Sequence, residues 1–327
     1  MSILVTGATG LVGNNVVRHL LQQGRAVRVL VREGADQRPL DGLSIERCYG
    51  DVRDADAVTR ACAGVTAVIH SAAYLHIGRE KLALQREINV RGTENVARAA
   101  RLAKARLLHI STINALDVPA DGVPLDETGQ GRQNVPCGYV LTKQEAEAVV
   151  RREIANGLDG LIANPGFMLG EWDWKPSSSR MFVQVVRRRP LLAPRGGLSV
   201  CDIDDVTAAL IQALDHSPTG RQFILAGHNI TYLELWRRMA ACAGSRPPLG
   251  RIGPVISWGA GLVGDTLARL RGNESDLNSA AVRMSGLFHF YSSERAKAEL
   301  NYRPRPLEET IRRTYAWLVQ QRYFSLP

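Results

Sequence analysis

The sequence predicts an α/β protein in which helices cover both faces of a parallel sheet, with a smaller, mostly helical region completing the chain. From residue 3 to residue 165, short apolar runs alternate with stretches whose apolar residues recur at helical spacing. Beyond Phe167 this cadence stops, and Trp, Pro and Ser interrupt the pattern in a predicted loop over 170–180. Alternating strands and helices build a doubly wound parallel sheet, whose ligands bind beyond the carboxyl ends of the strands.

The first strand, Ile3–Val5, runs into a glycine turn and then a predicted amphipathic helix. Gly7 permits the tight turn, Gly10 lets the backbone approach a pyrophosphate, and Gly13 lets the helix pack close to the strand. The N-terminus of the helix offers unpaired N–H groups and a partial positive charge. We therefore expect a dinucleotide pyrophosphate to bind at this turn. The candidate residues are Gly7, Thr9, Gly10, Leu11, Val12 and Gly13.

Composition limits the cellular setting. A chain of 327 residues with 45% apolar residues can form one large domain or two modest ones. We find no apolar run long enough to span a bilayer and no signal peptide before the first strand. The five cysteines are scattered and lack the spacing of metal ligands. We therefore expect a cytoplasmic protein with free thiols and no metal site.

The net charge of +9 is concentrated in the C-terminal half. Residues 1–160 contain 20 basic and 18 acidic residues, and the remainder contains 21 basic and 14 acidic residues. Such a field attracts anionic substrates, membrane surfaces or nucleic acids, but the chain has no nucleic-acid-binding motif. We interpret the excess as a solvated surface and expect no nucleic-acid partner.

The end of the predicted second strand, Ala26–Arg32, bears on the choice of cofactor. An acidic residue just past this strand would bind the 2′-hydroxyl of an adenosine ribose and repel a 2′-phosphate. The strand closes instead with Arg32, whose guanidinium suits a phosphate. Glu33 follows and would take the ribose role if the strand ended one residue later. We therefore favour NADP(H), with NAD(H) as the alternative.

Further candidates follow other strands. The predicted third strand, Ile45–Gly50, is followed by Asp51 and Val52, and a carboxylate there can accept a hydrogen bond from an adenine amino group. The predicted fourth strand is followed by Ala72 and Ala73, whose small side chains would let a cofactor lie across the strand ends. The next predicted helix, which carries Asn89, and the fifth strand occupy Leu82–Ala103 and Leu107–Ser111.

A tyrosine and a lysine lie four residues apart in GYVLTK, in a helix predicted to begin near Pro136. This spacing puts Tyr139 and Lys143 on one helical face. A nearby ammonium favours the phenolate, so we expect Lys143 to lower the pKa of Tyr139 toward neutrality. A tyrosine tuned in this way can exchange a proton at physiological pH. Thr112, just past the fifth strand, supplies a hydroxyl that can hold a substrate oxygen.

Motifs along most of the chain resemble those of one enzyme family. They are TGATGLVG, GDVRD, HSAA, NVRGTENV, STINAL, YVLTK and NPGFMLG, in that order. The chain resembles the extended short-chain dehydrogenase/reductases, and looks closest to the branch of dihydroflavonol 4-reductases, 3β-hydroxysteroid dehydrogenases and hopanoid-associated sugar epimerases. Two departures stand out. Asp202 occupies a position where the family often has a ring, and no tyrosine flanks Thr112 as in many nucleotide-sugar epimerases.

The resemblance implies a Rossmann fold and assigns roles to matching residues. Thr112 matches the catalytic Ser/Thr, Tyr139 the general acid/base, and Lys143 the lysine that tunes the tyrosine and binds the nicotinamide ribose. Arg32 resembles the arginine that selects NADP in the flavonoid reductases. Family members often pair as homodimers through the helices that hold Asn89 and Tyr139. The segment beside the nicotinamide is matched by Asn164, Pro165 and Gly166.

We expect the NADP-binding Rossmann domain to comprise residues 1–166 and 198–227, and the substrate-binding domain residues 167–197 and 228–327. Phe223–Leu225 should return to the sheet as an additional strand. Val255–Leu270 is apolar with glycines, and we interpret it as a lid helix, with peripheral attachment to anionic lipid as the alternative. Trp172 and Trp174 either line an apolar pocket or pack under the loop that carries them.

Three functions are compatible with these residues. The first is an NADP(H)-dependent reductase of a fairly apolar, small-molecule ketone or aldehyde, with Tyr139 as the general acid. The second is an NAD-dependent epimerase or dehydratase of a nucleotide-linked sugar that recycles its bound cofactor. The third, a non-catalytic NADP-binding sensor, is disfavoured because both Tyr139 and Lys143 are present.

Overall fold

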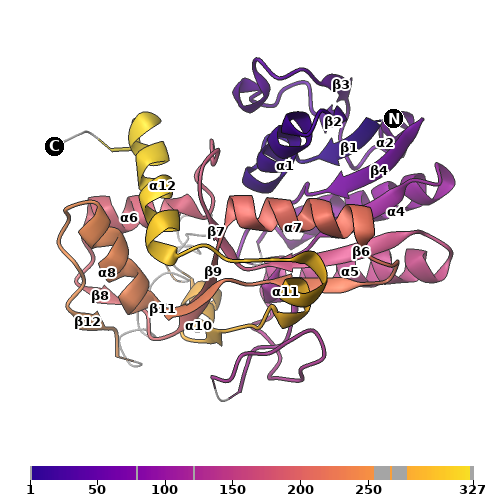
Figure 1. The fold of residues 1–327 in the computed structure, drawn as a ribbon. Helices are drawn as coiled ribbons and strands as arrows, with labels where there is room; N and C mark the ends of the chain where they lie inside the picture. The colour runs from indigo at the N-terminus through magenta and orange to yellow at the C-terminus, as the bar shows by residue number, and fades with distance from the viewer. Residues whose placement is uncertain (1, 79, 121, 254–265, 267–277, 325–327) are drawn as a thin grey trace.

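The computed structural model describes residues 2–78, 80–120, 122–253, 266 and 278–324. Its centre is a seven-stranded parallel sheet with the order β10-β6-β5-β4-β1-β2-β3 (Figure 1). The strands are β1 (Ser2–Thr6), β2 (Ala26–Val31), β3 (Glu46–Tyr49), β4 (Val65–His70), β5 (Arg106–Ile110), β6 (Gly160–Pro165) and β10 (Gln222–Leu225). The strand order reverses between β1 and β4, where such sheets form a ligand crevice. The predicted doubly wound fold is confirmed.

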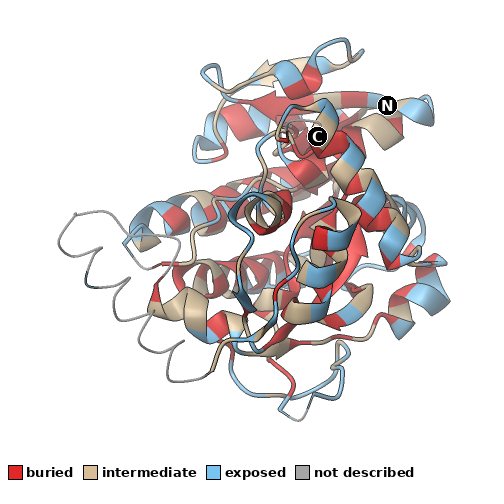
Figure 2. Cartoon of the chain, turned by 90° about the vertical axis from the view of Figure 1, so that its left-hand side faces the viewer, coloured by how far each residue is buried: buried red, intermediate tan, exposed pale blue. Residues whose placement is uncertain are grey.

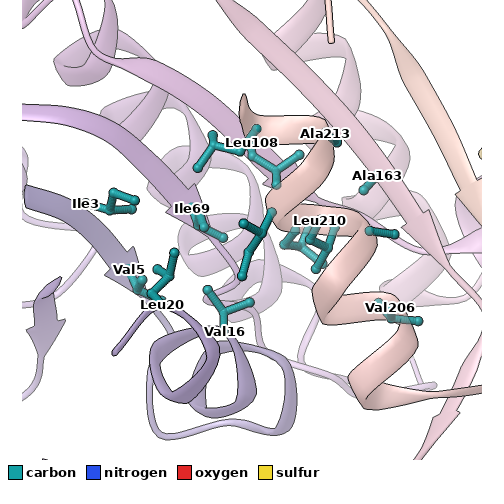
Figure 3. Close-up of a cluster of buried hydrophobic side chains, with 14 of the residues drawn as sticks. Ile3, Val5, Val16, Leu20, Ile69, Leu108, Ala163, Val206, Leu210 and Ala213 are labelled. Atoms are coloured by element: carbon teal, nitrogen blue, oxygen red, sulfur yellow. The ribbon is translucent and has the colours of Figure 1, made fainter. Parts of the chain in front are cut away.

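Helices cover both faces of this sheet, because alternate strand residues point to opposite sides. Ile3 and Val5 pack with Leu20 and Leu210 on one face (Figure 3), whereas Leu4 belongs to the core on the other face. The first face is covered by α1 (Leu11–Gln22) and α7 (Ile203–His216). The second is covered by α2 (Ala55–Cys62), α4 (Gly92–Leu102) and α5 (Gly138–Ala155).

The predicted helix over Leu82–Ala103 is present but not uniform. It comprises α3 (Leu82–Gln85), a π-helical segment η2 (Arg86–Arg91) and α4. Asn89 lies in the π segment, and such insertions occur often at functional sites. Two 3₁₀ turns, η1 (Arg38–Leu40) and η3 (Ile113–Ala115), complete the helical elements of this half.

A second, smaller sheet gathers four short strands from distant parts of the chain. Its centre is β9 (Gly197–Asp202), which pairs with β7 (Phe167–Leu169), β11 (His228–Thr231) and β13 (Phe288–His289). The sequence did not predict β7 or β9. Thus β9 joins the smaller sheet, whereas α7, which follows it, packs against the seven-stranded sheet, and β10 is the edge strand of that sheet.

Most of the remaining elements surround the smaller sheet, at the end of the molecule far from β3, whereas α11 (Glu294–Leu300) packs against β10 and α7 (Figure 1). Buried residues concentrate in the strands and on the inward faces of the helices (Figure 2). A two-stranded pair is formed by β8 (Leu192–Ala193) and β12 (Gly250–Arg251). The other helices are α6 (Ser179–Arg188), α8 (Tyr232–Cys242), α10 (Ser279–Ser285) and α12 (Leu307–Gln320).

The two tryptophans of the predicted loop serve packing. Their rings lie against Trp317 of α12, with centroids 4.7 Å away for Trp172 and 5.3 Å for Trp174. The Arg18 guanidinium carbon lies 3.4 Å from the centroid of the Trp172 ring, a cation–π contact that joins α1 to the loop. Of the two alternatives for Trp172 and Trp174, the structure favours packing.

Asp202 also has a structural role. Its carboxylate accepts a hydrogen bond from the backbone N–H of Asp204 at 2.9 Å and caps α7. Arg305, which leads into α12, lies 3.6 Å from Asp202 and 2.7 Å from Asp205. The acid that departs from the family pattern therefore helps to attach α12 to α7.

Among the helices that the structure describes, none combines the length and apolar character that crossing a bilayer requires. The predicted lid helix over Val255–Leu270 lies outside the described residues, apart from Thr266. All five cysteines are free thiols, and Cys62, Cys137 and Cys201 are buried.

Candidate active site

The glycine turn lies between the carboxyl end of β1 and the start of α1. Gly7 has a φ of +73°, and a Cβ on it would lie 2.6 Å from the backbone nitrogen of Ala72. A Cβ on Gly13 would lie 2.3 Å from the carbonyl oxygen of Gly7. Both contacts are impossibly short, so the turn and the close approach of α1 to β1 each require glycine.

The start of α1 fits a dinucleotide pyrophosphate. Gly10 is the N-cap and supplies no side chain to cap the helix. The first N–H groups of a helix have no intrahelical acceptor, so those of Leu11 and Val12 can bind an anion. A Cβ on Gly10 would meet a single atom, the Gly7 carbonyl oxygen at 3.4 Å, so the space beside Gly10 is open. Thr9 completes this turn.

A surface pocket lies where β2 and β3 end. Among its lining residues are Arg32, Glu33, Tyr49, Asp51 and Arg60. Strand β2 ends at Val31, one residue earlier than predicted, so Arg32 is the first residue past the strand. The side chains of both Arg32 and Glu33 are exposed. Arg60, which reaches the pocket from α2, was not predicted, because nothing in the sequence pattern places it near Arg32.

The Asp51 carboxylate is held by Arg53, with 2.9 Å between Arg53 Nε and Asp51 Oδ1. This hydrogen bond lowers the pKa of Asp51, and the charge of Arg32 lowers it further. The carboxylate therefore stays ionised at the pocket wall. Val52 is buried, and its carbonyl oxygen accepts a hydrogen bond from Asn95 at 2.9 Å.

Asn89 holds the chain just after Ala72 and Ala73. Its Oδ1 accepts a hydrogen bond from the backbone N–H of Tyr74 at 2.7 Å. Its Nδ2 donates to the Tyr74 carbonyl and the Thr142 hydroxyl, each at 3.0 Å. Because both ends of the amide are engaged by protein groups, Asn89 positions the segment at the strand ends and links it to α5.

The predicted catalytic residues come together at the carboxyl end of β5. Thr112 caps η3, Tyr139 lies in the first turn of α5, and Lys143 lies one turn later. The Thr112 hydroxyl lies near enough to the Tyr139 phenol to influence its pKa. Lys143 Nζ donates to the carbonyl oxygen of Ile110 at 2.8 Å. A hydroxyl, a phenol and an ammonium thus lie close together, which is the combination needed to hold a substrate oxygen and to give it a proton.

The predicted lowering of the Tyr139 pKa is wrong for this arrangement. Burial raises the pKa of Tyr139 to about 12, although the Thr112 hydroxyl opposes the rise. Burial lowers the pKa of Lys143 to about 8, although the Glu147 carboxylate opposes the fall. The sequence shows the spacing of the two groups but not their desolvation, which disfavours both charged forms. Tyr139 is therefore a neutral phenol that can donate a proton.

A buried network behind Thr112 fixes its backbone. Asn164 Nδ2 donates to the Thr112 carbonyl at 2.9 Å and to Glu147 Oε1 at 2.6 Å. Gln222 Nε2 donates to Asn164 Oδ1 at 2.8 Å. Glu147 was not predicted, although its position four residues after Lys143 places it on the same face of α5.

Pro165 and Gly166 lie where the chain passes from the large sheet to the small one. The Gly166 N–H donates to the Leu225 carbonyl at 3.1 Å. A Cβ on Gly166 would lie 2.5 Å from the Ser199 carbonyl oxygen, so the crossing with β9 requires glycine.

One side of Tyr139 is apolar. The ring packs in a cluster whose buried members include Val135, Val140 and Met284, with Leu287 at its margin. Met284 belongs to α10, so this wall is built partly by the second half of the chain.

Two buried histidines, which were not predicted, lie under the site together with Ser111. His70 and His109 are direct partners on β4 and β5, with ring centroids 5.4 Å apart. His70 Nδ1 shares a hydrogen bond with Thr6 Oγ1 at 2.7 Å. Burial lowers the pKa of both histidines and keeps them neutral. Ser111 Oγ is buried without a hydrogen-bond partner among the described residues, at the strand end that faces the crevice.

Comparison with known proteins agrees with this geometry. A model of the NAD dependent epimerase/dehydratase family matches residues 3–226. The chain is 30% identical to sterol demethylase protein B of Methylococcus capsulatus, over 98% of this chain and 99% of the relative. It is 27% identical to the 4-hydroxy-2-methyl-3-oxo-4-farnesyl-3,4-dihydroquinoline-1-oxide ketoreductase of Stigmatella aurantiaca, over 92% of each chain. The crystal structure of gox2253 matches with a TM-score of 0.88 and 33% identity over 99% of both chains. The chain therefore belongs to the NAD dependent epimerase/dehydratase family, the extended short-chain dehydrogenase/reductases.

Proposed function

We propose that this chain is an NADP(H)-dependent reductase of an apolar ketone or aldehyde. The observation that carries the proposal is Arg32. It is the first residue after β2, it lines the pocket at the ends of β2 and β3, and its exposed side chain makes no ion pair with the described residues. A free guanidinium at this position suits the 2′-phosphate that distinguishes NADP(H) from NAD(H).

The chain's own side chains supply the acid and the positioning. The cofactor, when bound, supplies a hydride for the carbonyl carbon. Thr112 donates a hydrogen bond to the carbonyl oxygen, and Tyr139 gives its phenolic proton to the same oxygen as negative charge develops there. Lys143, anchored on the Ile110 carbonyl, places a positive charge behind the phenol and stabilises the phenolate that remains.

The apolar wall beside Tyr139 supports an apolar substrate. Tyr139 borders a buried cluster that contains Val135, Val140 and Met284, so the described surroundings on this side of the ring are apolar and carry no charged group. The names of the sterol demethylase protein and of the farnesyl-bearing quinoline ketoreductase also point to lipophilic substrates. We therefore place the substrate among lipophilic carbonyl compounds.

A second candidate function is epimerisation or dehydration of a nucleotide-linked sugar with a tightly held NAD. The family description favours it, and Glu33 shares the pocket with Arg32. Rotation of the Glu33 side chain toward the ribose would replace a phosphate contact with a bond to the 2′-hydroxyl. The two functions differ in cofactor choice and in net cofactor consumption.

Fluorescence titration with NADPH and NADH separates them, after purified protein has been checked for bound nucleotide. We expect NADPH to bind more tightly, and Arg32→Ala to remove that preference while leaving NADH affinity unchanged. The matched control is Arg98→Ala, an exposed arginine on α4 that should change neither affinity. Preferential binding of NADH, or bound NAD that does not wash out, would favour the second candidate.

We also propose that two copies pair through the face formed by α3, η2, α4 and α5, where Leu84 and Leu102 are 39% and 64% exposed. Sedimentation velocity of the wild type and of Leu102→Glu tests this pairing, because a buried glutamate would separate the copies.

We place the protein in the cytoplasm, since all five cysteines are free thiols.

A further inference from the structure

The charge of this chain is segregated at one end of the molecule. Residues 174–201 contain six basic residues and no acidic residue, and residues 235–253 contain four basic and no acidic residues. Their ten positive charges together exceed the net charge of +9 for the whole chain. Strand pairing of β8 with β12, and packing of α6 against α8, bring the two segments together (Figure 1).

Three leucines are exposed in the same place. Leu191, Leu192 and Leu249 are 55%, 38% and 64% exposed, respectively. They are close to one another, because the N–H of Leu249 donates to the carbonyl of Leu191 at 2.8 Å and Leu192 pairs with Gly250. Arg189 is the C-cap of α6, with a φ of +46°, and Pro190 and Leu191 connect it to β8.

Several arginines around these leucines have no acidic partner among the described residues. Arg238 is neutralised by Glu234 and Glu308, and Arg187 and Arg237 bond to backbone carbonyls. The unneutralised arginines flank the leucines on α6, on the turn after β8, and on the chain that enters and forms β12. They are Arg188, Arg189, Arg195, Arg246 and Arg251. We call these arginines and the three leucines the basic end.

The basic end continues into the wall of the candidate site. Directly after Arg195, the N–H of Gly196 donates to the Ser285 carbonyl at 3.0 Å, and that of Gly197 donates to the Leu287 carbonyl at 3.0 Å. Ser285 and Leu287 flank the end of α10, whose Met284 packs against Tyr139. A surface bound at the basic end therefore lies next to the α10 segment whose Met284 packs against Tyr139.

We propose that the basic end docks on an anionic lipid bilayer as a peripheral membrane surface. Unneutralised arginines attract anionic headgroups, and exposed leucines gain from entering the boundary between headgroups and acyl chains. A nucleic acid or an acidic peptide would complement the charge but would leave the leucines in water, so the combination favours a bilayer. Where the proposed function holds, docking would also present the site to a lipophilic substrate dissolved in the bilayer.

Vesicle co-sedimentation of the full chain tests the proposal without any turnover. We expect binding to phosphatidylcholine vesicles that contain phosphatidylglycerol and little binding to phosphatidylcholine alone, with the affinity falling as salt is raised. Arg188→Gln with Arg189→Gln should weaken binding about 25-fold, at about fivefold for each cation lost. Leu191→Gln with Leu249→Gln should weaken it about tenfold or more, because their apolar burial is lost.

Matched controls lie in the loop between η3 and α5, outside both the basic end and the proposed pairing face. Val123 is 68% exposed, like Leu249, so Val123→Gln should leave vesicle binding unchanged, as should Arg132→Gln. Absence of binding to the anionic vesicles would overturn the proposal. So would equal losses in the control variants, or binding that the leucine variants do not alter, since charge alone would then explain it. A protein that fails as a reductase yet binds anionic vesicles would refute the proposed function and keep this inference.

Discussion

The two halves of this molecule are built on different principles. In the seven-stranded sheet, most strands carry buried apolar runs, and β1 to β6 follow one another along the chain through turns and helices. In the smaller sheet, β9 is paired with three strands that lie about 30 residues before it and about 30 and 90 residues after it. The strands of the first half can be predicted from local sequence patterns, whereas the smaller sheet forms only when segments distant in the sequence pair with one another.

The division corresponds to a division of chemistry. The groups proposed to act on the substrate, Thr112, Tyr139 and Lys143, are all fixed on the large sheet and on α5. The second half contributes the apolar wall through Met284 and the exposed, basic end. Reaction type should therefore depend on the first half and substrate choice on the second, as is general for sites supported on rigid elements.

The largest expected effect tests the first half. Tyr139→Phe keeps the packing of the ring but removes the acidic proton, so we expect turnover to fall about 10³-fold, within the range for loss of a general acid. Cofactor affinity, measured by fluorescence titration, should be unchanged. Tyr315→Phe, a partly buried tyrosine of the second half, is the control. Turnover that survives in the Tyr139 variant would remove Tyr139 from the mechanism.

The glycine turn offers a comparison within the first half. Gly13→Ala forces a Cβ to within 2.3 Å of a backbone oxygen, so we expect a loss of about 1–3 kcal/mol in the free energy of unfolding, the usual range for overpacking. Gly10→Ala meets its nearest atom at 3.4 Å and should fold normally while binding the cofactor more weakly. Urea unfolding and nucleotide titration of both variants give the two readouts. Equal destabilisation by both variants would contradict the distinction.

Met284→Ala probes the second half. Removing this side chain opens the apolar wall beside Tyr139, so we expect KM for a lipophilic carbonyl substrate to rise several-fold while kcat changes little. A fall in kcat with an unchanged KM would instead mean that Met284 positions Tyr139. Thermal unfolding of the variant should be measured alongside the kinetics, because truncating a buried methionine lowers the stability of the fold by itself.

The same contrast explains how far the sequence could predict the structure. Strands β1 to β6 and β10 were predicted to within a few residues, because apolar runs and the glycines in the turns between them can be recognised from neighbouring residues alone. Strand β9 reads GLSVCD, with a glycine at its start and an acid at its end, and all six residues are buried only because β7, β11 and β13 surround it. No window of the sequence contains those partners.

In the candidate site, too, the sequence predicts where residues lie but not how the fold changes their chemistry. The positions of Tyr139 and Lys143 follow from helical spacing, but the directions of their pKa shifts follow from burial by α10 and the large sheet. The π segment around Asn89 was also beyond prediction, since its sequence has ordinary helical spacing. Asn89 is engaged by Tyr74 and Thr142, which only the fold brings near.

The smallest expected effect concerns the pKa of Lys143, which depends both on its burial and on its distance from Glu147. The pKa of Lys143 is about 8, and the proposed reaction uses the ammonium, so activity should fall as the pH rises through that value. Glu147→Gln keeps an acceptor for Asn164 but removes a negative charge that raises the Lys143 pKa. The alkaline limb of the kcat profile should therefore move to lower pH by about one unit, the scale of one nearby opposite charge. Glu153→Gln, a buried glutamate of α5 paired with Arg101, should leave the limb in place. A limb that is unmoved in Glu147→Gln, or that moves to higher pH, would show that the ammonium of Lys143 does not set the alkaline limit.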